Sequence, residues 1–543
     1  MPTDSNSLTH MKYSFITLLA SAALLAAGCG GQQASQQPAH PGPITAGEHT
    51  RVNTTYGTVE GYLDDDVYTF KGIQYAQAER FMPPQAPDKF EGVRMCKLYG
   101  PKAPQRLDLV WRDNTQRDYN FGNQFVIEPM DEKACLVLNV WTKGINDGKK
   151  RPVFVWIHGG GYSTGSAHDL ACYEGRSLAD KGDIVTVSIN HRLNVLGYID
   201  LTALGGKYAQ SVNLGMQDIV AALEWIRDNI AKFGGDPDQV TIGGQSGGGG
   251  KVSTVMAMPS AKGLFKRAVV QSGSTLRAGD SEFSRKLGLA FLDELGVKPA
   301  QAEAKLGTFT YEELVEAGNR ASRKVAAAGV RAGFSPVMDG SIVAEHPFDP
   351  EATSISKDVP MLIGTDFNEF TFDISEDKTE AEVKAALVER MGEEKAVKFM
   401  EEFKKAFPDE PVKAMLYMDL RFRSGALQQA AAKSRQKGAN AYFYQFTWKP
   451  ENNVLGASHG MELPFMFNNV AIQREMTGSS ESAYALQEVI SNYWLAFIKT
   501  GDPNVAGQPV WEPYNEETGP CMILDNTCVL KYNHDKALVE LTQ

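Results

Sequence analysis

The residue that points most directly to chemistry is Ser246, at the centre of the segment Gly244-Gln245-Ser246-Gly247-Gly248. This segment matches G-x-S-x-G, a pattern in which a serine stands on a sharp turn between a strand and a helix. Residues 240–242 (VTI) before it are strand-like, and residues 251–256 (KVSTVM) after it can form a helix. Glycines two positions on either side allow a tight turn that exposes Oγ, and the helix N-terminus favours negative charge. Ser246 is therefore predicted to be a nucleophile.

A serine hydroxyl needs a base within hydrogen-bonding reach, and a third group must orient that base. Where G-x-S-x-G carries the nucleophile, the chain order is serine, acid, histidine. Three histidines follow the serine: His346, His459 and His534. His346 precedes a proline and His534 lies in a charged segment near the chain end, whereas His459 lies in a loop of small residues after a predicted strand. We therefore expect His459 to be the base.

The acid is expected on a loop between the serine and the histidine. Open α/β sheets place their sites at the carboxyl ends of strands. The predicted strand 359–365 (VPMLIGT) is followed by Asp366-Phe367-Asn368-Glu369. By position alone Asp366 and Glu369 are equally suitable, and the one without a role in the site would be a solvated loop carboxylate.

A second glycine-rich segment, His158-Gly159-Gly160-Gly161-Tyr162, follows the predicted strand 152–158. Acyl transfer passes through a tetrahedral intermediate whose oxygen needs N–H donors, each worth on the order of 3 kcal/mol of barrier. Three successive glycines let the backbone approach the substrate closely. We expect this segment, together with the N–H of Gly247, to form an oxyanion hole.

Elements that would position these residues alternate along the middle of the chain. The apolar, β-branched runs lack polar alternation, as expected for strands covered on both faces. The expected strands are residues 136–142, 152–158, 183–190, 239–243, 267–271, 359–365 and 441–448, with helices over 214–233 and from about 249. An antiparallel meander is expected over 58–76, and a mostly helical insertion precedes 441–448. This order predicts an α/β fold with a doubly wound, mostly parallel sheet in one domain, residues 50–543.

The first residues have the pattern of an export signal. Lys12 precedes the apolar run 14–27 (SFITLLASAALLAA), which is too short to span a bilayer, and Gly28 and Cys29 follow. The ending LAAGC resembles a lipoprotein box, so residues 1–29 are predicted to be a signal peptide and Cys29 the lipidated residue; a plain signal peptide is the alternative. Residues 30–49, rich in Gln, Pro and Gly, are expected to be a flexible tether. Both alternatives predict an exported protein, and the lipoprotein box predicts a membrane anchor in the cell envelope, facing the periplasm or the cell surface.

Composition narrows the range of partners. The chain has 543 residues, of which 43% are hydrophobic and 22% charged, which is typical of a globular protein. Its net charge of −12 is spread along the sequence without a basic cluster interleaved with aromatics, so no nucleic-acid partner is expected. Hydrolysis through an activated serine requires neither a metal nor a cofactor, and we expect none. Among the cysteines, Cys521 and Cys528 flank a strand and turn and could face each other across a hairpin, and Cys172 is then left over.

Taken together, these motifs resemble the type-B carboxylesterase family, which includes cholinesterases and p-nitrobenzyl-type esterases, from about Thr54 onward. The matching segments include 70–73 (FKGI), 135–141 (CLVLNVW), 158–162 (HGGGY), 233–237 (FGGDP), 459–463 (HGMEL) and 501–504 (GDPN). The resemblance implies an α/β-hydrolase fold, a triad of Ser246, Glu369 and His459, and oxyanion donors at Gly160, Gly161 and Gly247. It also implies a disulfide between Cys96 and Cys135, which would stabilise the fold by about 4 kcal/mol.

The sequence departs from the family pattern beside the nucleophile. Gln245 stands where the family usually has Glu, and Gly247 where it usually has Ala. Because a negative charge is missing there, we expect anionic acyl or alcohol groups to be tolerated better. The predicted function is hydrolysis of small-molecule carboxylic esters through an acyl-enzyme on Ser246. The alternatives are cleavage of amides or lactones by the same triad and a non-catalytic, cholinesterase-like binding module, which the complete triad disfavours.

Overall fold

The computed structural model describes residues 42–105, 129–329, 333–371, 373–451 and 454–542. The predicted signal peptide, with Cys29, and most of the predicted tether lie outside these residues. Pro43–Gln543 form one compact unit. This unit begins within the segment predicted as a tether, because the backbone of Thr45 pairs with Leu63 through hydrogen bonds of 2.9 and 2.8 Å. Within the described ranges, no helix has the length and hydropathy needed to span a membrane.

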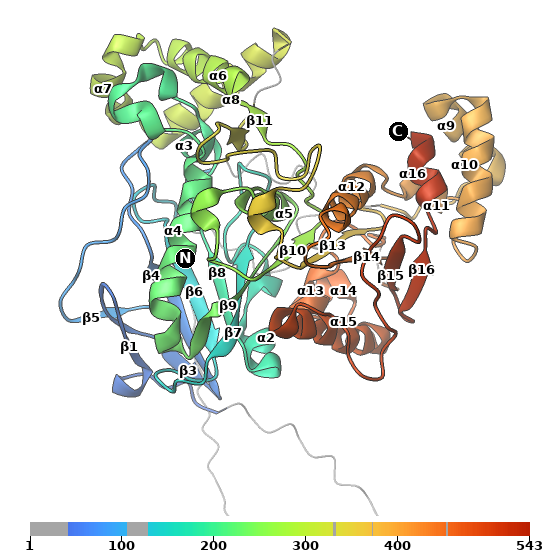
Figure 1. The fold of residues 1–543 in the computed structure, drawn as a ribbon, viewed down its shortest axis with the longest axis horizontal. Coiled ribbons are helices and arrows are strands. Elements are labelled where there is room, and N and C mark those ends of the chain that lie inside the picture. Colours follow the sequence, from blue (N-terminus) through green and yellow to red (C-terminus); the bar gives the residue numbers. More distant parts are fainter. Residues whose placement is uncertain (1–41, 106–128, 330–332, 372, 452–453, 543) are drawn as a thin grey trace, which may run out of the picture. The chain divides into compact units, whose positions relative to one another are not determined.

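A large mixed sheet forms the centre of this unit (Figure 1). The strand order is β16-β15-β14-β13-β10-β9-β7-β8-β6-β4-β3. Neighbouring strands from β8 through β15 are parallel, and the pairs at both edges are antiparallel. The strands are β3 (Tyr62–Asp64), β4 (Val67–Gln74), β6 (Val137–Thr142), β7 (Arg151–Ile157), β8 (Val185–Ile189), β9 (Gly235–Gln245), β10 (Arg267–Gln271), β13 (Met361–Asp366), β14 (Ala441–Phe446), β15 (Pro520–Leu524) and β16 (Val529–Tyr532). The predicted doubly wound, mostly parallel sheet is confirmed.

Helices follow the strands in the predicted order, with additional helices inserted between β10 and β14. The helices are α2 (Arg176–Gly182), α3 (Asn194–Tyr198), α4 (Leu214–Asn229), α5 (Gly247–Val255), α6 (Ser281–Glu294), α7 (Ala302–Lys305), α8 (Tyr311–Ala327), α9 (Glu380–Met391), α10 (Glu393–Ala406), α11 (Ala414–Tyr417), α12 (Arg421–Arg435), α13 (Leu463–Met466), α14 (Arg474–Thr477), α15 (Glu481–Thr500) and α16 (Lys536–Thr542). Two smaller sheets contain β1 (Arg51–Thr54), β2 (Gly57–Glu60), β5 (Val93–Met95), β11 (Gly279–Asp280) and β12 (Val337–Met338).

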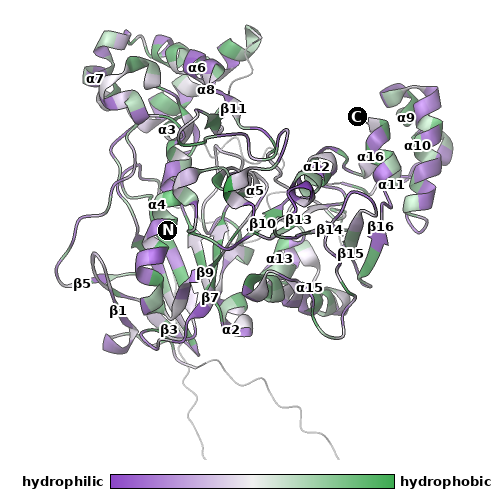
Figure 2. Ribbon diagram, in the orientation of Figure 1, coloured by the Kyte–Doolittle hydropathy of each residue, from purple (hydrophilic) through white to green (hydrophobic). Residues whose placement is uncertain are grey.

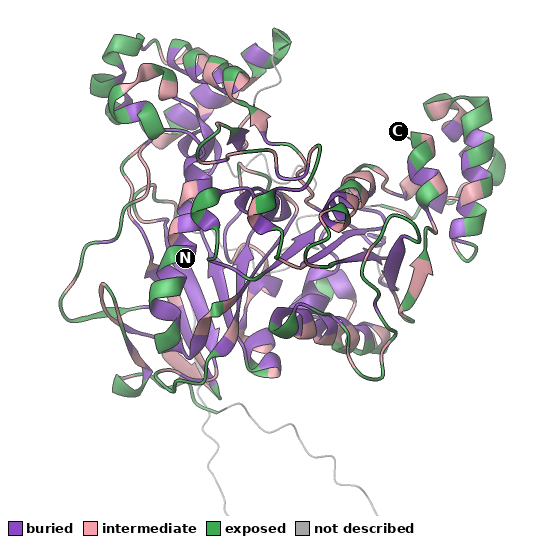
Figure 3. Ribbon diagram, viewed as in Figure 1, coloured by how far each residue is buried: buried purple, intermediate pink, exposed green. Residues whose placement is uncertain are grey.

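Both faces of the central sheet are covered by helices. Along β7, Val153 and Val155 belong to the same buried cluster as Ile219 of α4, whereas Phe154 belongs to the cluster that contains Trp494 of α15. Successive side chains of a strand point to opposite faces, so a strand buried on both faces has no polar alternation. Figure 2 shows the resulting run of hydrophobic colour along the central strands, and Figure 3 shows these strands buried while the outer faces of α6, α7, α9 and α10 are exposed.

The predicted disulfide between Cys96 and Cys135 is wrong, because both residues are free thiols. Burial in the apolar core raises the pKa of each thiol to about 12. Disulfide formation requires a thiolate, which these surroundings disfavour. The Cys135 Sγ atom instead lies 3.8 Å from the carbonyl oxygen of Glu132 as a weak donor.

The second pair of cysteines is also unbonded. Strands β15 and β16 form the predicted hairpin, but its register places Cys521 opposite Lys531. Cys528 lies before β16 begins, and the structure holds Cys172 as a buried free thiol as well.

Candidate active site

The strands β9, β10, β13 and β14 are adjacent and parallel, so their carboxyl ends lie at the same end of the sheet. Ser246 directly follows β9, and Glu369 lies three residues after β13. His459 lies on the loop after β14. An isolated β-bridge between Ser458 and Glu369 holds this loop close to the carboxyl end of β13. The carboxyl ends of the strands therefore bring together the regions that carry the predicted nucleophile, acid and base.

Ser246 occupies a strained turn. Its backbone has φ 58° and ψ −128°, a conformation that costs on the order of 1–3 kcal/mol for a residue other than glycine. The turn is a single residue long, so β9 extends to Gln245 and α5 begins at Gly247, two residues earlier than predicted. The flanking glycines allow the start of α5 to pass close to the end of β7, because a Cβ on Gly248 would lie 2.1 Å from the carbonyl oxygen of Ile157. The N–H of Ser246 donates to the oxygen of Gln271 at 2.8 Å.

The imidazole of His459 is oriented by Glu369. Its Nδ1–H donates a short hydrogen bond to Oε2 of Glu369, whose side chain is completely buried. The backbone strengthens the contact, since the N–H of His459 donates to the carbonyl oxygen of Glu369 at 2.8 Å. With Nδ1 protonated, Nε2 has a free lone pair, and this buried atom has no hydrogen-bond partner among the described residues. This arrangement is that of an imidazole prepared to accept a proton.

Asp366, the other predicted candidate for the acid, has a different environment. It is buried, so the expectation of a solvated loop carboxylate is wrong. Its Oδ2 accepts a hydrogen bond of 2.8 Å from the N–H of Gly460, and its side chain contacts that of Glu462. Burial, together with the negative charges of Glu462 and Glu369, raises the pKa of Asp366 well above its usual range.

A proton held between Asp366 and Glu462 explains their contact. Oδ1 of Asp366 and Oε2 of Glu462 are both buried and otherwise receive no hydrogen bond within the described ranges. Two carboxylates can satisfy each other only when one of them is protonated. We therefore describe the pair as one carboxylic acid bonded to one carboxylate, with Oε1 of Glu462 accepting from Gln271 at 2.9 Å.

The carbonyl groups of Gly159 and Gly160 in the predicted oxyanion loop accept hydrogen bonds. In a trans peptide the C=O and the following N–H point in opposite directions, so binding the oxygen orients the N–H. The Nδ1–H of His158 donates to the oxygen of Gly159 at 2.9 Å, and the N–H of Thr164 donates to that of Gly160 at 3.1 Å. The N–H groups of Gly160 and Gly161 are thereby fixed in direction. The positive φ of both residues, 82° and 60°, favours glycine.

Gly247 provides the third predicted donor. The oxygen of Ser246 accepts from the N–H of Gly250 at 3.1 Å, which orients the N–H of Gly247 in the same way. The N–H groups of Gly160, Gly161 and Gly247 make no hydrogen bond to any other described residue. Three oriented donors without partners are what an oxyanion hole requires.

Two phenyl rings that sequence reasoning missed lie beside the imidazole. The ring of Phe370 stacks on His459 with a centroid distance of 4.1 Å, although 56% of Phe370 is exposed. The ring of Phe422 lies 5.4 Å from His459 and 5.6 Å from Phe370. For Phe370 a signal was present in the sequence, since it directly follows Glu369; Phe422 lies 53 positions beyond Glu369 and had none.

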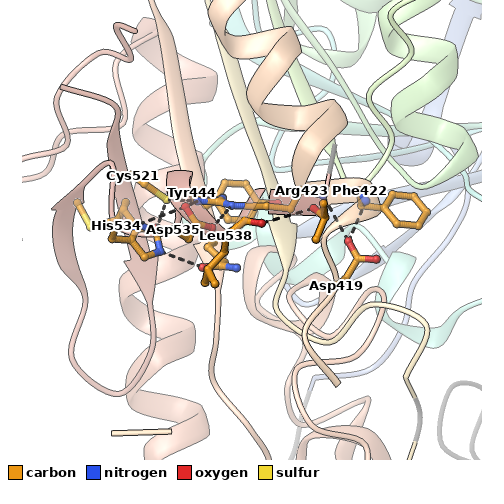
Figure 4. Close-up of polar contacts among 11 residues, drawn as sticks. Asp419, Phe422, Arg423, Tyr444, Cys521, His534, Asp535 and Leu538 are labelled. Atoms are coloured by element: carbon orange, nitrogen blue, oxygen red, sulfur yellow. Dashed lines mark hydrogen bonds and ion pairs between the residues drawn. The ribbon is translucent and has the colours of Figure 1, made fainter. Parts of the chain in front are cut away.

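A buried network of hydrogen bonds and an ion pair holds Phe422 in place (Figure 4). Asp419 accepts hydrogen bonds from the N–H groups of Phe422 and Arg423 at the start of α12. The Arg423 guanidinium pairs with Asp535, with N–O distances of 2.7 and 3.0 Å, and donates to the oxygen of Tyr444. The C-terminal segment and β14 thus hold the first turn of α12 against the site.

The described residues contain no group of three His, Cys, Asp or Glu side chains placed to hold a metal ion.

The chain is similar to known carboxylesterases. The model of the carboxylesterase family matches residues 48–539. Para-nitrobenzyl esterase of Bacillus subtilis (strain 168) is 32% identical over 89% of this chain and 96% of its own length. Phenmedipham hydrolase of Pseudarthrobacter oxydans is 30% identical over 87% of this chain and 94% of its own length.

Among solved structures, an esterase from Clostridium hathewayi described as hydrolysing aliphatic aromatic polyesters superposes with a TM-score of 0.84. It is 36% identical and covers 92% of this chain and 99% of its own. A thermophilic p-nitrobenzyl esterase has a TM-score of 0.73 at 30% identity, over 91% of this chain and all of its own. With its α/β-hydrolase fold, the chain belongs to the carboxylesterase family and is a carboxylic ester hydrolase.

Proposed function

We propose that the chain hydrolyses carboxylic esters through an acyl-enzyme on Ser246, with His459 as the general base and Glu369 as the residue that orients it. The observation that carries this proposal is the hydrogen bond from His459 Nδ1 to the buried Glu369. This bond leaves Nε2 free at the same end of the sheet as Ser246. Three oriented N–H groups, two on the glycine loop and one at the start of α5, support the same assignment.

The reaction follows from these positions. His459 Nε2 takes the proton of Ser246 Oγ as Oγ attacks the ester carbonyl carbon. The N–H groups of Gly160, Gly161 and Gly247 bind the resulting oxyanion, and the imidazolium, stabilised by Glu369, returns the proton to the leaving alcohol. Water then attacks the acyl-enzyme, His459 accepts the proton of that water, and release of the acid restores Ser246.

The rings of Phe370 and Phe422 support a preference for the alcohol part of the substrate. Because His459 hands its proton to the leaving alcohol, groups that surround the imidazole lie near that part of the ester. An exposed phenyl ring gains about 0.5–1.5 kcal/mol from pairing with another aromatic ring. We propose esters with aromatic or apolar alcohol groups, a class that includes the para-nitrobenzyl esters named for one similar protein.

The test is hydrolysis of p-nitrophenyl butyrate by the full chain and by Ser246→Ala. We expect the wild type to release p-nitrophenolate and to react with a fluorophosphonate probe, and the variant to do neither while keeping the wild-type unfolding temperature. Ser253→Ala is the matched control, since Ser253 lies on the same helix, is buried and donates to the oxygen of Gly249. Activity that survives in Ser246→Ala, or a folded wild type without activity, would contradict the proposal.

We also propose that the protein is exported and held at a membrane through a lipid on Cys29. The apolar run 14–27 followed by Gly28 and Cys29 supports this proposal. Expression of the full chain in bacteria with radiolabelled palmitate should label the wild type and not Cys29→Ser. Secretion of an unlabelled, shortened protein would instead indicate a plain signal peptide.

A further inference from the structure

A buried lysine lies beneath the predicted oxyanion loop. Lys251 stands on α5, five residues after Ser246, and its side chain is fully buried. Its Nζ donates a hydrogen bond of 3.0 Å to the carbonyl oxygen of His158 and lies 5.5 Å from the ring centroid of Tyr162. Burial of an ammonium group costs several kcal/mol unless partners compensate for it. Packing alone therefore does not explain why a lysine occupies this buried position.

Lys251 begins a series of hydrogen bonds that leads to the oxyanion donors. Its Nζ holds the oxygen of His158, and Nδ1–H of His158 holds the oxygen of Gly159. Because the peptide between Gly159 and Gly160 is trans, the second bond sets the direction of the N–H of Gly160. The helix that carries the nucleophile is thus connected to the loop that would receive the oxyanion.

Two histidines close to Lys251 do not carry a positive charge of their own. His158 and His191, stacked at 4.6 Å, are both buried, and burial lowers the pKa of each well below its usual value, so both are neutral. His168 faces the same group of side chains, and Asp169 is the acidic residue whose charge favours the ammonium. Tyr162, on the glycine loop, presents its ring.

Together, these effects place the pKa of Lys251 within the physiological pH range. Burial lowers the pKa of Lys251 to about 7, and Asp169 opposes this only in part. The ammonium and the neutral amine can both donate to the oxygen of His158. Only the ammonium adds a positive charge behind the loop.

We propose that Lys251 is a positioning residue for the oxyanion hole, whose ammonium holds the His158 carbonyl and supports negative charge on the substrate oxygen, so that ester hydrolysis is faster while Lys251 is protonated. The proposal rests on the acyl-enzyme function above. It assigns Lys251 no contact with substrate and no step of proton transfer.

The test compares Lys251→Met, which removes donor and charge, with Lys251→Gln, which keeps an N–H donor without charge. The matched control is Lys433→Met. Lys433 is another buried lysine, and it donates to the oxygens of Ser356 and Lys357 at 2.9 and 2.8 Å, at the opposite end of β13 from Glu369. Burial lowers the pKa of Lys433 to about 8, so the control also titrates in the range examined.

The readout is the ratio of wild-type to variant kcat for p-nitrophenyl butyrate between pH 6 and pH 10. Taking this ratio removes the pH dependence that the triad contributes to both proteins. Loss of a direct oxyanion donor lowers kcat by about 100-fold or more, so for this indirect role we expect about tenfold at pH 6, with KM changed less than about twofold. The ratio should fall toward about two at pH 9 for both Lys251 variants and stay flat for Lys433→Met.

Each outcome has a distinct meaning. A flat ratio, or a Lys251→Gln protein as active as wild type at pH 6, would overturn the role of the charge. A lowered unfolding temperature identifies a variant that has lost activity because its fold is destabilised. If Lys251→Met is destabilised in this way, the more conservative Lys251→Gln tests the proposal. If the wild type is inactive, or if Ser246→Ala remains active, the proposed function fails, whatever Lys251 does.

Discussion

The backbone N–H of Asp366 donates a hydrogen bond of 2.9 Å to Oε1 of Glu369. The loop after β13 therefore folds back on itself, and two carboxyl groups only three residues apart have different environments. Glu369 contacts the imidazole of His459, whereas Asp366 lies against Glu462 and the N–H of Gly460.

Glu369→Gln should lower kcat for p-nitrophenyl butyrate by about 100- to 10,000-fold, with a small change in KM. A neutral amide neither stabilises the imidazolium nor holds the tautomer with Nδ1 protonated. Steady-state kinetics together with unfolding temperature test this expectation. A loss of less than tenfold would contradict the assignment of Glu369 as the orienting acid.

Asp366→Asn is the matched comparison and should keep kcat within about threefold of wild type. Asparagine has the shape of the protonated acid, and it can donate to Glu462 while accepting from the N–H of Gly460. A loss as large as that expected for Glu369→Gln would make Asp366 part of the proton-transfer machinery and would contradict the shared proton described here.

The same variant should change how stability depends on pH. The pKa of Asp366 is raised in the folded state, so between about pH 4 and that raised pKa the folded chain holds a proton that the unfolded chain has released. Stability from this group is thus present below about pH 4 and is lost as pH rises. Asp366→Asn should become more stable relative to wild type between pH 5 and pH 8, measured by urea unfolding. A constant difference would show that Asp366 is ionised.

Gly247→Ala should lower kcat by at least about tenfold, although the family pattern usually has Ala at this position. A Cβ on Gly247 would lie 2.2 Å from the carbonyl oxygen of Gly161, so the oxyanion loop would have to move. Complete loss of one donor costs on the order of 3 kcal/mol of barrier, and a displaced donor costs part of this. Gly307→Ala is the control, because a Cβ there meets no atom within 4 Å. Equal kcat values for the two variants would show that the loop moves at little cost.

Gln245→Glu should weaken turnover of anionic esters selectively. Gln245 is almost fully buried, its Nε2 has no hydrogen-bond partner among the described residues, and it directly precedes Ser246. A carboxylate there would repel a negatively charged substrate by about 1–2 kcal/mol, roughly a tenfold loss in kcat/KM. Mono-p-nitrophenyl succinate and p-nitrophenyl butyrate provide the comparison. If both substrates lose equally, the missing charge does not set acyl preference.

Phe370→Ala should raise KM for phenyl and benzyl butyrate about two- to tenfold and leave ethyl butyrate nearly unchanged. The exposed ring stacks on His459, where the leaving alcohol would lie, and an aromatic pair contributes about 0.5–1.5 kcal/mol. An equal effect on the three esters would indicate that Phe370 supports His459 and does not bind the alcohol.

Local patterns in the sequence were sufficient for much of the fold. The central strands are predicted with errors of a few residues at their ends, because both faces of the sheet are covered and the runs are continuously apolar. The turn at Ser246 is predicted from its glycines, since no side chain fits between β9, α5 and the end of β7. The limits of β9 and α5 differ from prediction because Ser246 alone forms the turn.

By itself, the sequence determined the alternation of strands and helices of a doubly wound fold, the turn at Ser246, the glycine loop and the histidine after β14, because each depends on neighbours along the chain. Only the tertiary structure shows that Glu369, which the resemblance implied, contacts His459 while Asp366 does not, that Cys96 and Cys135 are free thiols, and that Lys251 lies beneath His158. These outcomes depend on burial and on partners far away in the sequence. A carboxyl, thiol or ammonium group takes its protonation from what surrounds it in the folded chain, and no local pattern specifies those surroundings.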